Sequence, residues 1–316
     1  MSIERAGAER GLPERPDSAQ EWPDWLIVRI PAEGPAASVD GLLRDLSLHT
    51  VCEEASCPNI WECYTHRTST FLIMGDTCTR HCAFCGVRHA SPRTPVAPVD
   101  PDEPARLAEA ARRLGLTHVV ITSVTRDDLP DGGAGVFAAC IREVRRVMPD
   151  TSVEVLVPDF RGDRAALDQV LAAAPDVFNH NVETVPRLYS KVRPQAEYRR
   201  SLDVLAAAAA AGLTVKSGLI LGLGETASEV EAVLQDLHQA GCRLVTIGQY
   251  LRPSPHQLPV ARLVPPEEFA ELEKKALALG FTGVASGPLV RSSYRAAEMR
   301  QSTVPGGQSP PTIRGF

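Results

Sequence analysis

The chain has 316 residues, of which 44% are hydrophobic and 23% charged, and its formal net charge is −6. These proportions are typical of globular domains, so the chain can bury a sizeable core in one or two domains. The negative charge argues against nucleic acid as the main partner, and no apolar run approaches the ~18 residues that would suggest a membrane span.

Residues 1–45 are predicted to form a partly extended segment laid over the body of the protein, because they are rich in Pro, Gly, Ala and Glu. Trp22 and Trp25 are its strong anchors. The opening MSIERAGAERGLPERP lacks the apolar core of a secretory signal, which predicts a cytoplasmic location. A short helix is expected over residues 38–46, where Ser and Asp caps accompany GLLRDL.

Six of the eight cysteines lie close together, in two triplets with different spacings. The first has the pattern C-x4-C-x5-C within residues 46–68 and consists of Cys52, Cys57 and Cys63. The second has the pattern C-x3-C-x2-C after an apolar strand expected at 71–74, and consists of Cys78, Cys82 and Cys85. Three thiolates leave one corner of a tetrahedral or cubane site open. The triplets therefore predict two metal centres, each with one vacancy.

The spacing of the cysteines leaves three interpretations open. Structural zinc usually has all four coordination positions filled by protein ligands, commonly two C-x2-4-C pairs. Neither triplet supplies two such pairs, although His66 and His81 lie nearby. A disulfide framework belongs to short secreted chains. Iron–sulfur fits best, because cysteine-rich runs with short gaps wrap cubane clusters.

From residue 70 onward, apolar β-branched runs alternate with helical stretches. Six strand–helix units predict a parallel sheet, which right-handed crossovers curl toward a barrel. We expect an α/β fold, a partial (β/α)6 TIM-type barrel over residues 69–285, with extensions at both ends covering its mouth. A doubly wound sheet is the alternative. Strands are expected at 71–74, 118–124, 153–157, 177–180, 214–221 and 244–250, and helices at 104–114, 135–147, 163–173, 201–211, 227–240 and 266–279.

Polar residues in or after these strands are expected to converge on the barrel mouth, where such folds carry their sites. They are Asp127, Asn181, Glu183, Lys216 and Gln249. Asp127 lies in TRDDLPDGGA, which a capped Asp-Pro-Gly turn also explains. Lys216, within an apolar strand, is costly to bury without a carboxylate partner, from Glu183 or from a ligand.

Other conspicuous residues have structural explanations. Gly-Leu-Gly at 222–224 fits a tight turn better than a phosphate loop, because no G-x-G-x-x-G accompanies it. Cys140 and Cys242 are expected to be buried small hydrophobes. The four basic residues between 191 and 200 are interpreted as a solvated face, with a dock for an acidic carrier protein as the alternative.

Residues 286–316 form a C-terminal segment that carries RSSYRA at 291–296. The residues after Ala296 are predicted to form a mobile tail. The second cysteine triplet, with Phe84 before its last cysteine, resembles the radical S-adenosylmethionine (SAM) superfamily. Together with the first triplet and RSSY, it resembles the lipoyl synthase family over roughly residues 46–296. The similarity includes TRDDLPDGGA, HNVETV, LILGLGET and QYLRPS.

The resemblance implies two [4Fe–4S] clusters and SAM as cofactors. The second triplet would hold the cluster that cleaves SAM. The first would hold an auxiliary cluster, consumed as the sulfur donor, with Ser293 as a displaceable fourth ligand and Arg291 neutralising charge; Ser292 is the alternative by a shift of one position. The expected SAM contacts are Phe84, Asp127, Asn181, Glu183, Lys216 and Gln249.

The implied reaction removes hydrogens from C6 and C8 of an octanoyl chain on a lysine of a lipoyl-carrier or H-protein-type domain and inserts two sulfurs. The partners implied are that carrier, an electron donor, and an iron–sulfur repair or carrier protein. The octanoyl chain calls for an apolar channel about 10 Å long. The alternatives are another radical SAM sulfur-insertion or methylthiolation enzyme, and a non-catalytic metal-binding module.

Overall fold

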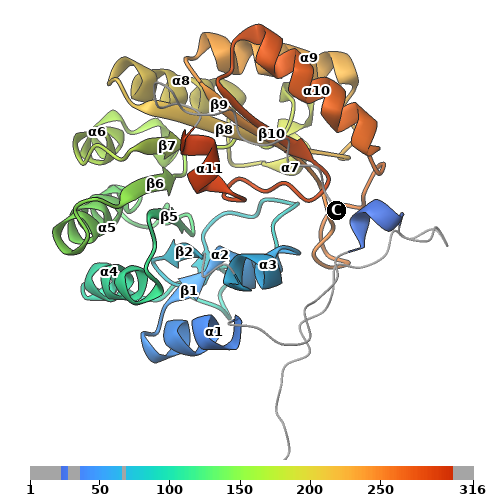
Figure 1. Ribbon diagram of the computed structural model, residues 1–316. Coiled ribbons are helices and arrows are strands. Elements are labelled where there is room, and N and C mark those ends of the chain that lie inside the picture. Colours follow the sequence, from blue (N-terminus) through green and yellow to red (C-terminus); the bar gives the residue numbers. More distant parts are fainter. Residues whose placement is uncertain (1–22, 28–35, 66–68, 302–316) are drawn as a thin grey trace, which may run out of the picture.

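A curved, mostly parallel sheet organises the computed structural model, which describes residues 23–27, 36–65 and 69–301. The sheet has eight strands in the order β1-β2-β5-β6-β7-β8-β9-β10, and only β1 is antiparallel to its neighbour. Helices line its outer face (Figure 1). The strands are β1 His49–Thr50, β2 Thr70–Ile73, β5 His118–Ser123, β6 Ser152–Leu156, β7 Val177–Asn179, β8 Thr214–Leu221, β9 Leu244–Gln249 and β10 Gly283–Gly287.

The larger helices follow the predicted alternation with the strands, and shorter elements lie at the two ends and in the loops. A two-stranded sheet pairs β3 (Thr77–Cys78) with β4 (Arg88–His89). The α-helices are α1 Ala36–Asp45, α2 Val51–Glu54, α3 Ile60–Thr65, α4 Glu103–Leu114, α5 Ala134–Val147, α6 Arg164–Ala172, α7 Tyr189–Val192, α8 Tyr198–Ala210, α9 Ala227–Gln239, α10 Pro266–Leu279 and α11 Ala296–Gln301. The 3-10 helices are η1 Asp24–Leu26, η2 Phe160–Gly162 and η3 Pro186–Leu188.

The strand order confirms a partial barrel. From β2 to β10 the order is sequential, with no reversal of the kind that defines a doubly wound sheet. The six predicted strands are present, and a seventh parallel strand, β10, was missed. Its sequence GVASG is too rich in Gly and Ser to predict a strand, yet it pairs with β9 along its whole length and is entirely buried. The predicted barrel boundary at residue 285 therefore divides a strand.

The ends of the helices follow from local chemistry. Thr226 and Glu229 form a reciprocal capping box at the start of α9. Gly115 and Gly280 end α4 and α10 in the left-handed conformation, which glycine adopts without strain. The turn predicted at 222–224 is closed by Glu225, whose carboxylate accepts the N–H groups of the first two of these residues at 2.6 and 2.9 Å. That carboxylate occupies the place a phosphate would take.

The C-terminal extension begins at the carboxyl ends of the strands and continues into the curve of the sheet (Figure 1). Ser292 meets Asn181, just beyond β7, whereas Arg300 in α11 pairs at 3.0 Å with Asp176, just before β7. Residues 296–301 are thus a helix, which corrects the predicted mobile tail for that stretch. Residues 302–316 and Trp22 lie outside the described residues. Within the described part of the chain, no helix has the length and apolar character that a membrane span needs.

Candidate metal and cofactor centre

The second cysteine triplet lies in the loop that leaves β2 at its carboxyl end. The chain turns out of the strand through Met74 and Gly75, both with positive φ (68° and 90°). The buried carboxylate of Glu103 accepts the Met74 N–H at 2.9 Å and holds this turn. Gly133 packs against the Met74 side chain with a φ of 87°, a conformation that favours glycine.

The loop carrying Cys78, Cys82 and Cys85 is bound to neighbouring elements along its length. The Cys78 sulfur accepts the N–H of Thr125 at 3.3 Å, and the carbonyl of Cys85 accepts the Gln257 side chain at 3.1 Å. Burial, together with repulsion from the other two thiols, raises the pKa of Cys85 to about 12. The three sulfurs therefore lie close enough to repel one another as thiolates.

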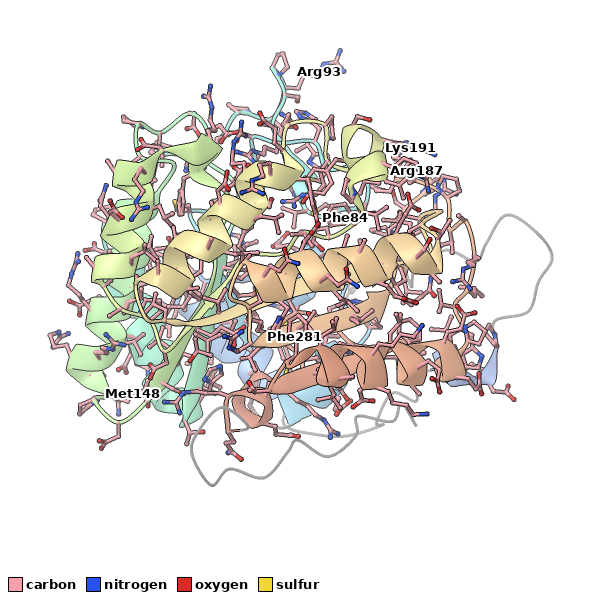
Figure 2. All side chains as sticks on the ribbon, turned by 90° about the horizontal axis from the view of Figure 1, so that it is seen from above. Phe84, Arg93, Met148, Arg187, Lys191 and Phe281 are labelled. Atoms are coloured by element: carbon pink, nitrogen blue, oxygen red, sulfur yellow. The ribbon has the colours of Figure 1, made fainter. Side chains whose placement is uncertain are left out.

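Phe84 is half-buried and packs against the main hydrophobic core. The preceding residue, Ala83, donates its N–H to Val192 in α7 at 2.9 Å, so Phe84 lies near the helix that carries Lys191 (Figure 2). Its predicted contact with SAM stays a prediction.

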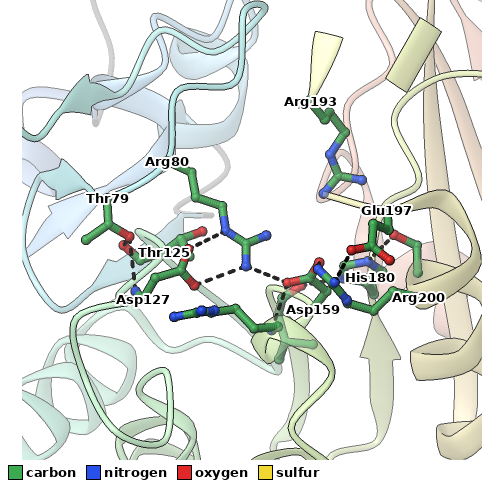
Figure 3. Close-up of polar contacts among 12 residues, drawn as sticks. Thr79, Arg80, Thr125, Asp127, Asp159, His180, Arg193, Glu197 and Arg200 are labelled. Atoms are coloured by element: carbon green, nitrogen blue, oxygen red, sulfur yellow. Dashed lines mark hydrogen bonds and ion pairs between the residues drawn. The ribbon is translucent and has the colours of Figure 1, made fainter. Parts of the chain in front are cut away.

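A buried ion network underlies this loop (Figure 3). Arg80, only 3% exposed, donates to both carboxylate oxygens of Asp127 at 2.7 and 3.0 Å and to Asp159 at 2.6 Å. Asp159 in turn pairs with Arg200 in α8 at 3.3 Å. Both oxygens of Asp127 accept hydrogen bonds from Arg80, which attaches Asp127 to the cysteine loop. The predicted contact of Asp127 with SAM stays a prediction.

Asn181 and Glu183 do lie together beyond β7. The Asn181 amide N–H group donates to Glu183 at 3.1 Å, and its oxygen is buried without a partner among the described residues. Glu183 has a positive φ of 64°, held by backbone bonds to Gly218 and Ile220 in β8. Burial raises the pKa of Glu183. A strained, partly buried carboxylate next to an unsatisfied amide oxygen is suited to binding a polar ligand.

The basic residues between 191 and 200 are not one solvated face. The Arg193 guanidinium is 8% exposed and donates to the carbonyls of Asn181 and Val182 at 2.8 and 3.2 Å. It opposes the rise that burial causes in the pKa of Cys82. Arg193 is therefore part of the site, whereas Arg199 is exposed and pairs with Asp203 in the same helix.

Two predicted SAM contacts are corrected. Lys216 is fully buried, and its ammonium group pairs with Glu154 in β6 at 2.8 Å, not with Glu183 or a ligand. Gln249 is fully buried too. Its amide nitrogen donates to three carbonyls at 3.0–3.1 Å and its oxygen accepts the Val264 N–H at 2.8 Å. Gln249 is thus engaged by backbone groups of β8 and of the loop after β9, and it organises that loop.

The first cysteine triplet lines a separate pocket that is partly open to solvent. The pocket lies near the amino end of β2, opposite the end that leads to the second triplet. The pKa of Cys52 is raised to about 12, because burial and the neighbouring Cys57 outweigh the lowering effect of hydrogen bonds with Thr70. Its lining residues are Cys52, Cys57, Asn59, Cys63, Ser69, Thr70, Arg291, Ser293 and Tyr294.

The C-terminal RSSY element closes this pocket and separates the two candidate serines. Ser293 lines the pocket with the three cysteines, whereas Ser292 accepts a hydrogen bond from Asn181 on the other side. Arg291 lies close enough to oppose the rise that burial causes in the pKa of Cys57. The geometry therefore favours Ser293 over Ser292 as the candidate fourth ligand of the first triplet. Arg291 favours the thiolate form of Cys57.

The donor set fits an iron–sulfur cluster. Three cysteine sulfurs, one serine oxygen and one arginine surround a single pocket, which matches three thiolates, one exchangeable corner and a compensating charge. Among the described residues, no three His, Cys, Asp or Glu groups are close enough together to hold one metal ion. A cubane needs a wider triangle, because each thiolate binds a different iron.

Comparisons with known proteins agree with this geometry. Residues 72–237 match the Radical SAM superfamily model. The chain is 55% identical over 299 residues to lipoyl synthase of Methylococcus capsulatus, covering 92% of each chain. It is 52% identical to lipoyl synthase of Frankia alni, covering 89% of this chain and 85% of that one.

The chain belongs to the lipoyl synthase family. Among solved structures, methylornithine synthase PylB has a TM-score of 0.51 at 13% identity, covering 80% of this chain and 76% of that one. The hydrogenase maturase HydG also has a TM-score of 0.51, at 17% identity, covering 68% and 50%. At this identity the two structures show only that this chain shares their fold.

Sequence reasoning missed several residues of the site. Arg80 stands inside the cysteine motif, and Asp159 follows the strand expected at 153–157, so their places in the chain could have indicated them. Glu154 lies inside an apolar strand, as Lys216 does, and buried charges usually come in pairs. No local pattern pointed to Glu62, which bonds to Tyr294 across 232 positions.

Proposed function

We propose that this chain makes the lipoyl group, inserting two sulfur atoms at C6 and C8 of an octanoyl chain amide-linked to a lysine of a carrier domain. The observation that carries the proposal is the pocket that Ser293 shares with Cys52, Cys57 and Cys63. A serine oxygen is a harder ligand than thiolate and poorly matched to iron–sulfide, so it can be displaced when sulfur leaves.

Membership of the lipoyl synthase family implies different roles for the two triplets, and they lie at opposite ends of β2. When bound, the clusters and SAM supply a carbon-centred oxidant at one end and sulfur at the other. The four residues of β2 span on the order of 10 Å, which is about the length of an extended octanoyl chain. An acyl chain lying along the inner face of the sheet could therefore reach both sites.

The chain's own side chains hold these sites in place and keep water out. Arg80 fixes the second triplet through Asp127 and Asp159. Asn181 and Glu183 are the groups we assign to hydrogen-bonding SAM, because the amide oxygen of the former has no partner among the described residues. Burial of these groups strengthens each hydrogen bond to a ligand by lowering the local dielectric.

The partners follow from this chemistry. An octanoylated lipoyl-carrier or H-protein-type domain is the substrate, an electron donor reduces the second-triplet cluster, and a repair or carrier protein rebuilds the auxiliary one. All eight cysteines are free thiols, which suits the cytoplasm we propose as its location.

The test is a product assay on anaerobically reconstituted protein. Octanoyl-lysine peptide, SAM and a reductant should yield lipoyl-lysine and two 5′-deoxyadenosines per product. Ser293→Ala should lower lipoyl-lysine at least ~100-fold, as expected for loss of a group essential to the reaction, while 5′-deoxyadenosine still forms. Ser292→Ala is the neighbouring comparison and should lose less, because Ser292 lies outside the pocket.

Two results would count against the proposal. If the wild-type protein cleaved SAM without sulfur appearing in the peptide, another radical SAM reaction would be indicated. If Ser293→Ala made lipoyl-lysine at the wild-type rate, the serine would have no part in sulfur transfer.

A further inference from the structure

The hydroxyl of Tyr294 makes an unusual contact beside the auxiliary pocket. It donates to both carboxylate oxygens of Glu62, at 2.9 and 3.0 Å. Arg295 approaches the same carboxylate at 3.4 Å, and its guanidinium lies 5.5 Å from the centre of the Tyr294 ring. A tyrosine, an arginine and a glutamate thus join the C-terminal segment to α3, the helix that carries Cys63.

The same segment is attached to the auxiliary helix region at a second point. Asn59, which precedes α3, donates its side-chain amide to the carbonyl of Leu289 at 2.7 Å. The two attachments, at Leu289 and at Tyr294, flank Ser293 in the chain. The Tyr294 ring is 8% exposed and packs with Met299 beside Cys63, so the attachment is also hydrophobic.

We propose that Glu62 and Tyr294 form a latch that positions Ser293 against the first cysteine triplet. The proposal rests on the proposed function, in which Ser293 is the displaceable corner of the auxiliary site. A ligand that must detach during turnover is held weakly, so its return depends on the residues beside it in the chain. The latch keeps the segment docked while the serine oxygen is free, and therefore raises the local concentration of that oxygen at the pocket.

The experiment measures iron release to a ferrous chelator from the reconstituted full-length protein, under anaerobic conditions and without substrate. Two clusters should give two kinetic phases, and Ser293→Ala identifies the auxiliary one by accelerating it. Tyr294→Phe removes only the donor hydroxyl, and should accelerate the same phase roughly ten- to a hundredfold, the effect of losing one hydrogen bond to a charged group. Glu62→Gln keeps an acceptor oxygen and should have a smaller effect than Glu62→Ala.

The matched control is Tyr64→Phe. Tyr64 lies on the same helix next to Cys63, but its hydroxyl bonds to Thr50 at 3.0 Å and does not reach the C-terminal segment. Deleting it should leave the auxiliary phase within about twofold of wild type, since the hydrogen bond lost is neutral and joins α3 to Thr50, not to the C-terminal segment. The double variant Glu62→Ala/Tyr294→Phe should release iron no faster than the more severe of the two single variants.

The outcomes separate the latch from the proposed function. If Ser293→Ala changes neither phase, the serine is not a ligand and the proposed function loses its support. If Ser293→Ala acts but Tyr294→Phe does not, the latch is refuted alone. Equal acceleration by Tyr64→Phe and Tyr294→Phe would indicate general loosening of α3, and additive effects in the double variant would show that the two residues act separately; either result overturns the latch.

Discussion

Replacing Lys216 by Met should destabilise the protein strongly without removing a cofactor contact. The lysine and Glu154 are at most 1% exposed, and their charged atoms lie 2.8 Å apart inside the barrel. Burial raises the pKa of Glu154, but Lys216 and His118 outweigh it and hold the pKa at about 2. Removing the lysine leaves a buried carboxylate without its main partner.

The expected loss of unfolding free energy is about 3–5 kcal/mol, the usual effect of removing one member of a buried ion pair. We expect the lower part of this range, because His118 at 3.3 Å and Asn179 at 3.4 Å still contact the carboxylate. The double variant Glu154→Gln/Lys216→Met leaves no buried charge from this pair. It should recover about half of the loss or more.

The assay is urea unfolding of the cluster-free protein at neutral pH, followed by SAM binding to the reconstituted variants. The folded Lys216→Met protein should bind SAM with wild-type affinity, because Glu154 and not a ligand neutralises the lysine. The reasoning is refuted if stability is unchanged while SAM affinity falls. That pair of results would restore Lys216 as a SAM contact.

Three further changes test the site from other directions. Arg80→Lys keeps the charge but not the forked contacts with Asp127 and Asp159, so SAM cleavage should fall roughly tenfold or more, while Arg88→Lys, at an exposed ion pair, should not change it. Gly248→Ala places a Cβ 2.1 Å from the Val290 carbonyl oxygen and should displace the segment before Ser293. Iron analysis of this variant should then show a loss of about four of the eight irons. A full complement of iron would contradict this prediction. Burial and Arg193 lower the pKa of His180 to about 4, so its contribution to stability should be lost as pH falls from about 6.5 toward 4, by at most about 1.4 kcal/mol per unit. Urea unfolding across that range should show a weaker dependence of the unfolding free energy on pH for His180→Gln than for wild type. If the two proteins showed the same dependence, His180 would not be the group responsible.

Local sequence information was enough to predict much of this architecture. Alternating β-branched and helical stretches predicted six strand–helix units, and these are present within a few residues of their expected bounds. The strand at Gly283–Gly287 escaped detection because its glycines and serines carry little strand propensity. Pairing with β9 determines its conformation, and that pairing is not visible in five residues of sequence.

The candidate site divides in the same way. The spacing of Cys78, Cys82 and Cys85 within one loop indicated a metal centre, because ligands so close in sequence must also be close in space. Lys216 was correctly expected to need a carboxylate partner, but that partner is Glu154 and not Glu183. Gln249 was expected to contact SAM at the barrel mouth, whereas its amide bonds to nearby backbone groups. Choosing between candidate partners requires the register of neighbouring strands, since a shift of one residue sends a side chain to the other face.

By itself the sequence determined the chemistry available to this protein: two thiol triplets, a repeated strand–helix pattern and a C-terminal element with two serines. Only the tertiary structure decided which serine faces the first triplet, since Ser293 and Ser292 differ by one position and point to different neighbours. It also brought Glu62 to Tyr294 and Glu154 to Lys216. Such contacts between residues distant in the chain arise from how strands and helices pack around one core, and no local pattern encodes that packing.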